Sequence, residues 1–166
     1  NNATPHVFIA TYSWNGTNFS EIPSSTLDLG KENRSLRCNN FQLLDQDSDG
    51  DQEIVLALGS PFRGFAVVNF NANGMSLSKK IRPDQLLVGS GLLYVGVVDY
   101  DGDGYDDVLA LSPDGNTIKA QPFYNIGGVF DSGHLVRKQI DGLSGILPNS
   151  IQLTDWDADG FSDVLV

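Results

Sequence analysis

The sequence of 166 residues predicts an all-β fold in one repeat domain. Short apolar runs alternate with Gly, Asn and Pro, and no segment combines a 3.6-residue apolar period with helix caps. A nine-residue acidic motif also recurs three times, and its first aspartates are 54 and 56 residues apart. A period of this length is typical of arrays built from one supersecondary unit.

The predicted elements follow the same order in each repeat. Short strands precede the acidic motifs, at 41–44, 93–98 and 150–154. Apolar strands, of the kind that is covered on both faces, follow the motifs at 54–58, 108–111 and 164–166. Asn-Gly and Gly-Gly turns, which accept positive φ, predict hairpins at 6–22, 64–81 and 117–136.

The repeat divides the chain into three units of about 55 residues, 1–56, 57–110 and 111–166. Four short antiparallel strands in a unit of this size are typical of a β-propeller blade. The length of the chain also matches its repeat. If a second copy followed Val166 directly, Asp155 would lie 56 residues before Asp45 of that copy, which is the spacing between Asp99 and Asp155. Both an excerpt of a longer array and units that follow one another head to tail predict this match.

The formal net charge of −11 is a local feature. Of the 21 acidic residues, 14 lie in the three motifs, and the remainder of the chain carries 7 acids against 10 bases. The hydrophobic content of 40% excludes a disordered chain, and the uncharged, apolar run 86–98 is too short to span a bilayer as a helix. The single cysteine, Cys38, excludes an internal disulfide framework, and we expect it to be a buried, small apolar residue, with an intermolecular disulfide as the alternative. We expect neither a nucleic-acid partner nor membrane insertion.

The acidic motifs have the residue pattern of calcium loops. Acids at positions 1, 3 and 5 place three carboxylates inside a tight turn, glycine at position 6 permits the reversal, and position 9 supplies another acid. The backbone carbonyl of position 7 can complete the shell. The predicted ligands of three Ca²⁺ sites are Asp45, Asp47, Asp49, Asp51 and Glu53; Asp99, Asp101, Asp103, Tyr105 and Asp107; and Asp155, Asp157, Asp159, Phe161 and Asp163.

Two other interpretations of these motifs are weaker. A solvated acidic turn explains one motif, since Asp and Gly are common in turns, but not three in register. An EF-hand needs a bidentate Glu at position 12, and this sequence has Leu56, Ala110 and Val166 there.

The three motifs resemble the D-x-D-x-D-G-x-x-D loops of FG-GAP, or VCBS-type, repeats in the β-propeller of integrin alpha chains. This resemblance covers most of the chain and implies calcium in the loops, blades of a propeller and a role in cell adhesion. Glu53 departs from the usual Asp at position 9, and the Gly-Ala-Pro element of the family is matched only loosely at 59–61 and 112–113. Integrin-type propellers have seven blades, so we expect further blades or copies of the chain, in a ring or an open filament.

Four Asn-x-Ser/Thr sequons lie in the first 35 residues, at Asn2, Asn15, Asn18 and Asn33. The composition, with 13 Asn and 21 Ser and Thr, predicts about 1.6 by chance. Polar turn composition is the alternative explanation. We expect N-glycosylation of at least one sequon, and a secreted or cell-surface protein, where calcium is plentiful.

No set of residues indicates catalysis, because neither His6 nor His134 lies in a metal or nucleophile motif. The sequence therefore favours a structural or adhesive, assembly-forming protein that is not an enzyme. The alternatives are a lectin or integrin-like module that binds a carbohydrate or protein ligand, and an accessory fragment of a secreted hydrolase. For Trp14 and Trp156 we expect packing, with sugar stacking as the alternative role.

Overall fold

The computed structural model describes residues 6–31, 38–59, 62–71, 74–83, 94–114, 117–134, 136–139, 152–159 and 162–165. These residues form thirteen β-strands and contain no helix, which confirms the all-β prediction. The described part of the chain accordingly has no helix that could cross a membrane.

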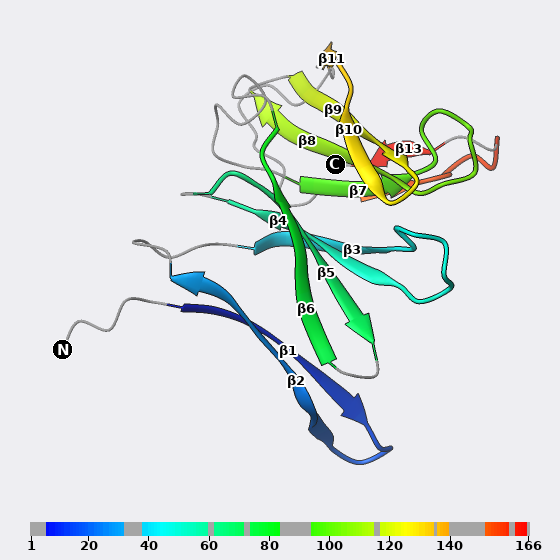
Figure 1. The fold of residues 1–166 in the computed structure, drawn as a ribbon. Helices are drawn as coiled ribbons and strands as arrows, with labels where there is room; N and C mark the ends of the chain where they lie inside the picture. Colours follow the sequence, from blue (N-terminus) through cyan, green and yellow to red (C-terminus); the bar gives the residue numbers. More distant parts are fainter. Residues whose placement is uncertain are drawn as a thin grey trace.

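The strands form four antiparallel sheets in chain order (Figure 1). The first sheet contains β1 (His6–Trp14) and β2 (Phe19–Lys31). The second is a meander of β3 (Cys38–Leu44), β4 (Glu53–Leu58), β5 (Gly64–Asn71) and β6 (Gly74–Ile81). The third contains β7 (Tyr94–Val98), β8 (Asp107–Asp114), β9 (Thr117–Ile126), β10 (Val129–Ser132) and β11 (Val136–Gln139). The fourth contains β12 (Gln152–Thr154) and β13 (Asp163–Leu165).

The second and third sheets have the same width. In the third sheet β10 pairs with residues 123–126 of β9, and β11 pairs with residues 117–120 of the same strand. Both strands therefore share one position beside β9, and the sheet is a meander four strands wide. The three predicted hairpins are present as β1–β2, β5–β6 and β9–β10.

The second sheet is covered on both faces because its two central strands contain runs of consecutive apolar residues, at 54–58 in β4 and 65–68 in β5. Val55 and Ala57 of β4 belong to a core shared with the third sheet, whereas Leu56 and Leu58 belong to a core with Leu29 of the first sheet. Successive side chains of a strand point to opposite faces, so this division follows from the sequence of β4 alone.

The third sheet repeats this arrangement. Val108 faces the second sheet, where Phe65 and Phe123 make an edge-to-face contact with ring centroids 5.0 Å apart. Leu109 faces the other way and packs in a cluster with Leu153 of the fourth sheet. A Cβ at Gly96 of β7 would collide with the Leu153 side chain, so glycine permits this close approach. The sheets therefore stack face to face in chain order.

Three expectations about burial are wrong. The apolar run after the third motif is not doubly covered, since residues 163–165 of β13 are exposed. Cys38 is exposed because it begins the edge strand β3, and its Sγ donates a hydrogen bond to the Asn40 carbonyl. Trp156 is 75% exposed in the third motif, whereas Trp14, which is 57% exposed, packs against Phe19.

The boundaries of the three sequence units do not coincide with the boundaries of the sheets. The unit boundary at 56/57 falls inside β4, and the boundary at 110/111 falls inside β8. In the first sheet, β1 and β2 correspond to the hairpin β5–β6 of the second. In the fourth, β12 and β13 correspond to β3 and β4, the strands that flank an acidic motif.

Candidate metal centres

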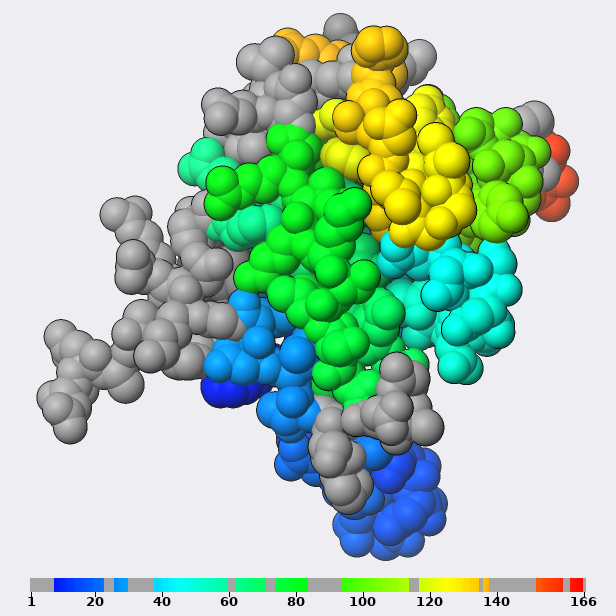
Figure 2. All heavy atoms as spheres, in the orientation of Figure 1, coloured from blue at the N-terminus to red at the C-terminus, as the bar shows by residue number. Residues whose placement is uncertain are grey.

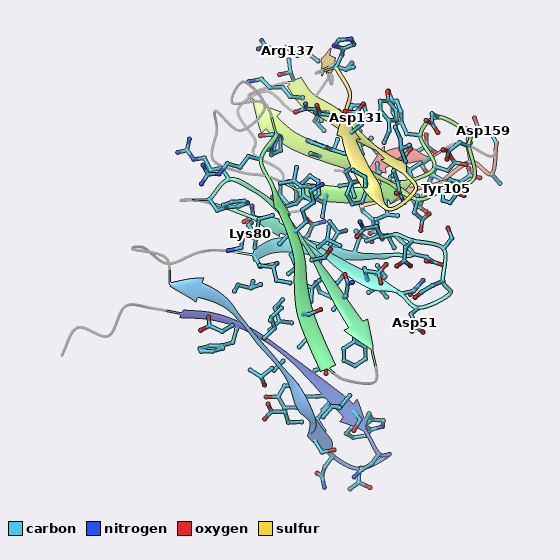
Figure 3. All side chains as sticks on the ribbon, in the orientation of Figure 1. Asp51, Lys80, Tyr105, Asp131, Arg137 and Asp159 are labelled. Carbon is cyan, nitrogen blue, oxygen red and sulfur yellow. The ribbon has the colours of Figure 1, made fainter. Side chains whose placement is uncertain are left out.

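The three acidic motifs occupy equivalent positions in successive sheets. We name them loop 1 (45–53), loop 2 (99–107) and loop 3 (155–163). They join β3 to β4, β7 to β8 and β12 to β13. All three lie on the right-hand side of the stack in Figure 1, and the labelled Asp51, Tyr105 and Asp159 mark them in Figure 3.

In each loop the structure brings together the carboxylates of positions 1, 3 and 9. One oxygen from each lies within 4.8 Å of the others, in the trios Asp45, Asp47 and Glu53; Asp99, Asp101 and Asp107; and Asp155, Asp157 and Asp163. Opposite ligands of one Ca²⁺ ion lie about 4.6–5.2 Å apart, which is twice the calcium–oxygen distance. The trios thus match the size of a calcium shell, and they supply only the oxygen ligands that this ion prefers.

The position 9 carboxylate closes each loop across its base. Its oxygen accepts the backbone N–H of position 2, in the pairs Glu53–Gln46 at 2.7 Å, Asp107–Tyr100 at 2.8 Å and Asp163–Trp156 at 3.0 Å. Position 9 is also the first residue of the second strand in each case. The loop is therefore anchored at the strand that leaves it.

The position 1 carboxylate organises the turn from within. Asp99 accepts the backbone N–H groups of Gly102, Asp103 and Gly104, and Asp155 accepts that of Asp159. The predicted glycine reversal is present, because Gly50 and Gly104 at position 6 have φ of 90° and 91°.

Position 4 has a left-handed backbone in all three loops, a feature that the motif did not predict. Ser48 has φ of 60°, Gly102 79° and Ala158 59°. This conformation costs a residue with a Cβ about 1–2 kcal/mol. Only loop 2 has glycine there.

Burial separates the trios in loops 1 and 2 from that in loop 3. Glu53 is 5% exposed and Asp107 is 1% exposed, whereas Asp163 is exposed. Burial raises the pKa of Glu53 and of Asp107, and the neighbouring aspartates raise both further, although backbone N–H groups act in the opposite direction. Two carboxylates at the separation within a trio repel by about 3–4 kcal/mol at an effective dielectric constant near 20. A cation would remove this repulsion.

An unpaired oxygen in loop 1 supports the fit to a cation. Asp45 Oδ1 is buried and accepts no hydrogen bond, whereas its Oδ2 accepts the N–H of Gly50 at 3.1 Å. A buried carboxylate oxygen without a donor is costly unless a positive charge faces it. The donor set and this oxygen together fit a hard divalent cation.

Other predicted ligands lie outside the trios. At position 5, Asp49 and Asp103 accept the N–H groups of Asp51 and Tyr105, and Asp159 also lies outside its trio. Asp51 and Tyr105 themselves are exposed, and Phe161 lies outside the described residues.

Three residues in or beside the loops were not predicted as part of the site. Asp106 Oδ2 accepts the Asp45 N–H at 3.3 Å, and the amides of Gln46 and Asn125 lie buried between loops 1 and 2. No spacing rule connects residue 46 to residue 125, so only the folded chain reveals this contact.

Two predicted sequons lie on the exposed turn between β1 and β2. Asn15 and Asn18 are both exposed, and Asn15 Oδ1 accepts the N–H groups of Thr17 and Asn18. Asn2 and Asn33 lie outside the described residues.

A cavity of about 740 Å³ lies between loop 2 and the fourth sheet. Leu109, Leu153 and Val164 form its apolar part, and Asp99 and Asp101 line the side beside loop 2. Tyr100, which also lines it, is 48% exposed.

Comparison with known proteins adds no relative. No family model matches the chain, and neither a curated protein nor a solved structure matches it.

Proposed function

We propose that this chain is an extracellular, calcium-binding glycoprotein repeat unit with a structural and adhesive role, and that it acts by assembly rather than catalysis. The observation that carries the proposal is one carboxylate trio at the same place in three successive sheets. In this proposal each sheet is a propeller-type blade, as in FG-GAP repeats, and the exposed Asn15 and Asn18 accept glycans.

The trios connect two strand ends in each sheet. Position 1 directly follows the first strand, and position 9 begins the second, as Asp99 and Asp107 do for β7 and β8. Bound calcium supplies the positive charge that holds these carboxylates together. The carboxylates of the chain then fix the two strands relative to each other, and the apolar faces of β4 and β8 carry this order into the adjacent sheets.

Thermal unfolding with and without EDTA tests the calcium role. At free calcium ten times above Kd, each site stabilises the fold by about 1.4 kcal/mol, so three sites contribute about 4 kcal/mol. EDTA should lower the Tm of the wild type, and it should not change that of the control D47N/D101N/D157N. A wild-type Tm that is the same in calcium and in EDTA would refute the proposal.

The strand edges support assembly with further copies of the chain. Among the described strands β13 pairs with β12 alone and β1 with β2 alone, whereas their counterparts β4 and β5 pair with each other. We propose that β13 of one copy pairs with β1 of the next, head to tail, which covers two exposed edges.

Light scattering over a range of protein concentrations tests this pairing. The mass should grow with concentration for the wild type but not for V164P, because proline removes a backbone donor from β13. In the control S76P the proline lies on β6 instead. A wild type that remains monomeric would contradict head-to-tail assembly.

The cavity beside loop 2 favours a second candidate function, a module that binds a carbohydrate or protein ligand. Its apolar walls and the exposed Tyr100 can pack on a sugar ring or an apolar side chain. Glycan-array binding that depends on calcium and is lost in Y100A would support this candidate. Binding that Y100A retains would exclude this cavity as the ligand site.

A further inference from the structure

A buried hydrogen-bonded bridge connects loop 1 to loop 2. The turn between β9 and β10 lies against loop 1, and Figure 2 shows the yellow atoms of this hairpin directly above the cyan atoms of residues near 45–50. Asn125 Nδ2 donates to the Gln46 carbonyl at 2.7 Å, and Gln46 Nε2 donates to the Gly128 carbonyl. Gly128 N–H in turn donates to Asn125 Oδ1 at 3.0 Å.

The bridge ends on a position 9 carboxylate at each side. The Asn125 N–H donates to Asp107 Oδ1 at 2.7 Å, and the Gln46 N–H donates to Glu53 Oε2 at 2.7 Å. The connection from Asp107 to Glu53 therefore passes through two residues only.

The members of the bridge are removed from solvent. Gln46 is 8% exposed, Glu53 5%, Asp107 1% and Asn125 1%. Water cannot replace a broken bond at such positions, and an unpaired buried polar group costs about 1–3 kcal/mol. Hydrogen bonds in a chain also polarise one another in a low dielectric. A change in the position of either carboxylate is thus transmitted to the other.

We infer that loops 1 and 2 bind their cations as a positively coupled pair, with Asn125 and Gln46 as the positioning residues that connect them. The inference rests on the proposed calcium function. Coupling of this kind is reciprocal, and its typical range is about 5–150-fold in affinity. Repulsion between two bound cations would lower the affinity of each loop when the other is occupied. An increase in affinity therefore identifies the bridge as its cause.

Terbium luminescence can distinguish the loops, because a bound lanthanide in a calcium site is sensitised by nearby aromatic rings. Loop 1 has no aromatic residue, loop 2 has Tyr100 and Tyr105, and loop 3 has Trp156 and Phe161 but no tyrosine. The exposed Trp156 can be changed in the W156F variant without disturbing a core. In W156F the tyrosine-sensitised signal then reports the terbium affinity of loop 2, and in the unchanged protein the tryptophan-sensitised signal reports loop 3.

The decisive comparison is the effect of disabling loop 1. With D47N added to W156F, we expect the terbium Kd of loop 2 to rise at least about fivefold. In W156F/N125A the same D47N substitution should leave the Kd unchanged. If N125A does not give the circular dichroism spectrum of a folded protein, W156F/N125D replaces it, because aspartate keeps an acceptor for the Gly128 N–H but has no donor for the Gln46 carbonyl.

N40A is the matched control. Asn40 also joins the second and third sheets by two hydrogen bonds, since its Nδ2 donates to the Val95 carbonyl and its Oδ1 accepts the Val95 N–H, but it lies on β3 away from the loops. The D47N effect should persist in W156F/N40A. Three results would overturn the inference: loss of the D47N effect in N40A, its persistence in N125A or N125D, or a loop 2 Kd that D47N leaves unchanged or lowers. Absence of terbium and calcium binding at every loop would instead refute the proposed function.

Discussion

Loops 2 and 3 carry the same motif in different surroundings. Both end on an aspartate that accepts the N–H of position 2, Asp107 in one and Asp163 in the other. Asp107 is covered by the β9–β10 hairpin and is 1% exposed, whereas Asp163 begins a strand that is exposed throughout its described length. The third sheet lies between two others, and the fourth packs on one described neighbour.

The comparison shows that copies of one motif can differ in how much they contribute to the free energy of unfolding. A buried carboxylate loses its hydration and depends on hydrogen bonds and on a cation for compensation, but an exposed one retains water. Loop 2 therefore depends on its ligands more strongly than loop 3, although the two sequences are closely similar. The same argument applies to Glu53 of loop 1, which is 5% exposed.

The largest expected effect comes from the position 9 aspartates. In saturating calcium, D107N should lower the free energy of unfolding by about 3 kcal/mol. The substitution removes a buried negative charge that faces the cation and that accepts the backbone N–H groups of Tyr100 and Asn125. The control D163N should cost less, about 1.4 kcal/mol, because it weakens one calcium site but its exposed carboxylate leaves no buried group unpaired. Urea unfolding measures both values. Equal losses in the two variants would show that burial does not distinguish the loops.

Most of the local structure could be predicted from the sequence. Strands β5 and β6 pair as predicted up to Asn71 and Gly74, and the turn 125–128 separates β9 from β10, because Asn and Gly accept the conformations of tight hairpins. The run Ile54–Leu58 likewise indicates a strand covered on two faces, and its side chains divide between two cores. These features depend on residues that are close in the sequence, where turn preferences and the alternation of side chains along a strand determine the structure.

Contacts between distant segments could not be predicted. The equivalent run at 164–166 has the same apolar composition, yet the described residues of β13 are exposed because no described strand covers them. Within the site, the acidic spacing predicts Asp99, Asp101 and Asp107 among five ligands, but it does not show that Asp103 lies outside their trio. It also does not predict Asn125, which reaches the trio from another strand. The left-handed position 4 was also missed, because Ser48 and Ala158 have none of the glycine signal present at Gly102.

A smaller effect is expected where the third and fourth sheets meet. G96A places a methyl group against the Leu153 side chain, which must shift, and overpacking of this kind costs about 1–3 kcal/mol. Because the second sheet packs on the other face of the third, the damage should remain local. Amide hydrogen exchange should therefore become faster in β12 and β13 and stay unchanged in β3 and β4. Faster exchange in β3 and β4 as well would show that the fourth sheet is not separable from the rest.

The smallest effect concerns position 4, where loop 2 has the residue that its backbone favours and loop 3 does not. A158G removes a Cβ from a left-handed conformation and should stabilise loop 3 by about 1 kcal/mol or less, since glycine also gains freedom in the unfolded chain. G102A imposes the reverse change on loop 2 and should destabilise it by about 1 kcal/mol. Urea unfolding in EDTA isolates this backbone effect from calcium binding. If the two substitutions shift stability in the same direction, backbone strain at position 4 is not what distinguishes these loops, and the burial of position 9 alone would have to explain their difference.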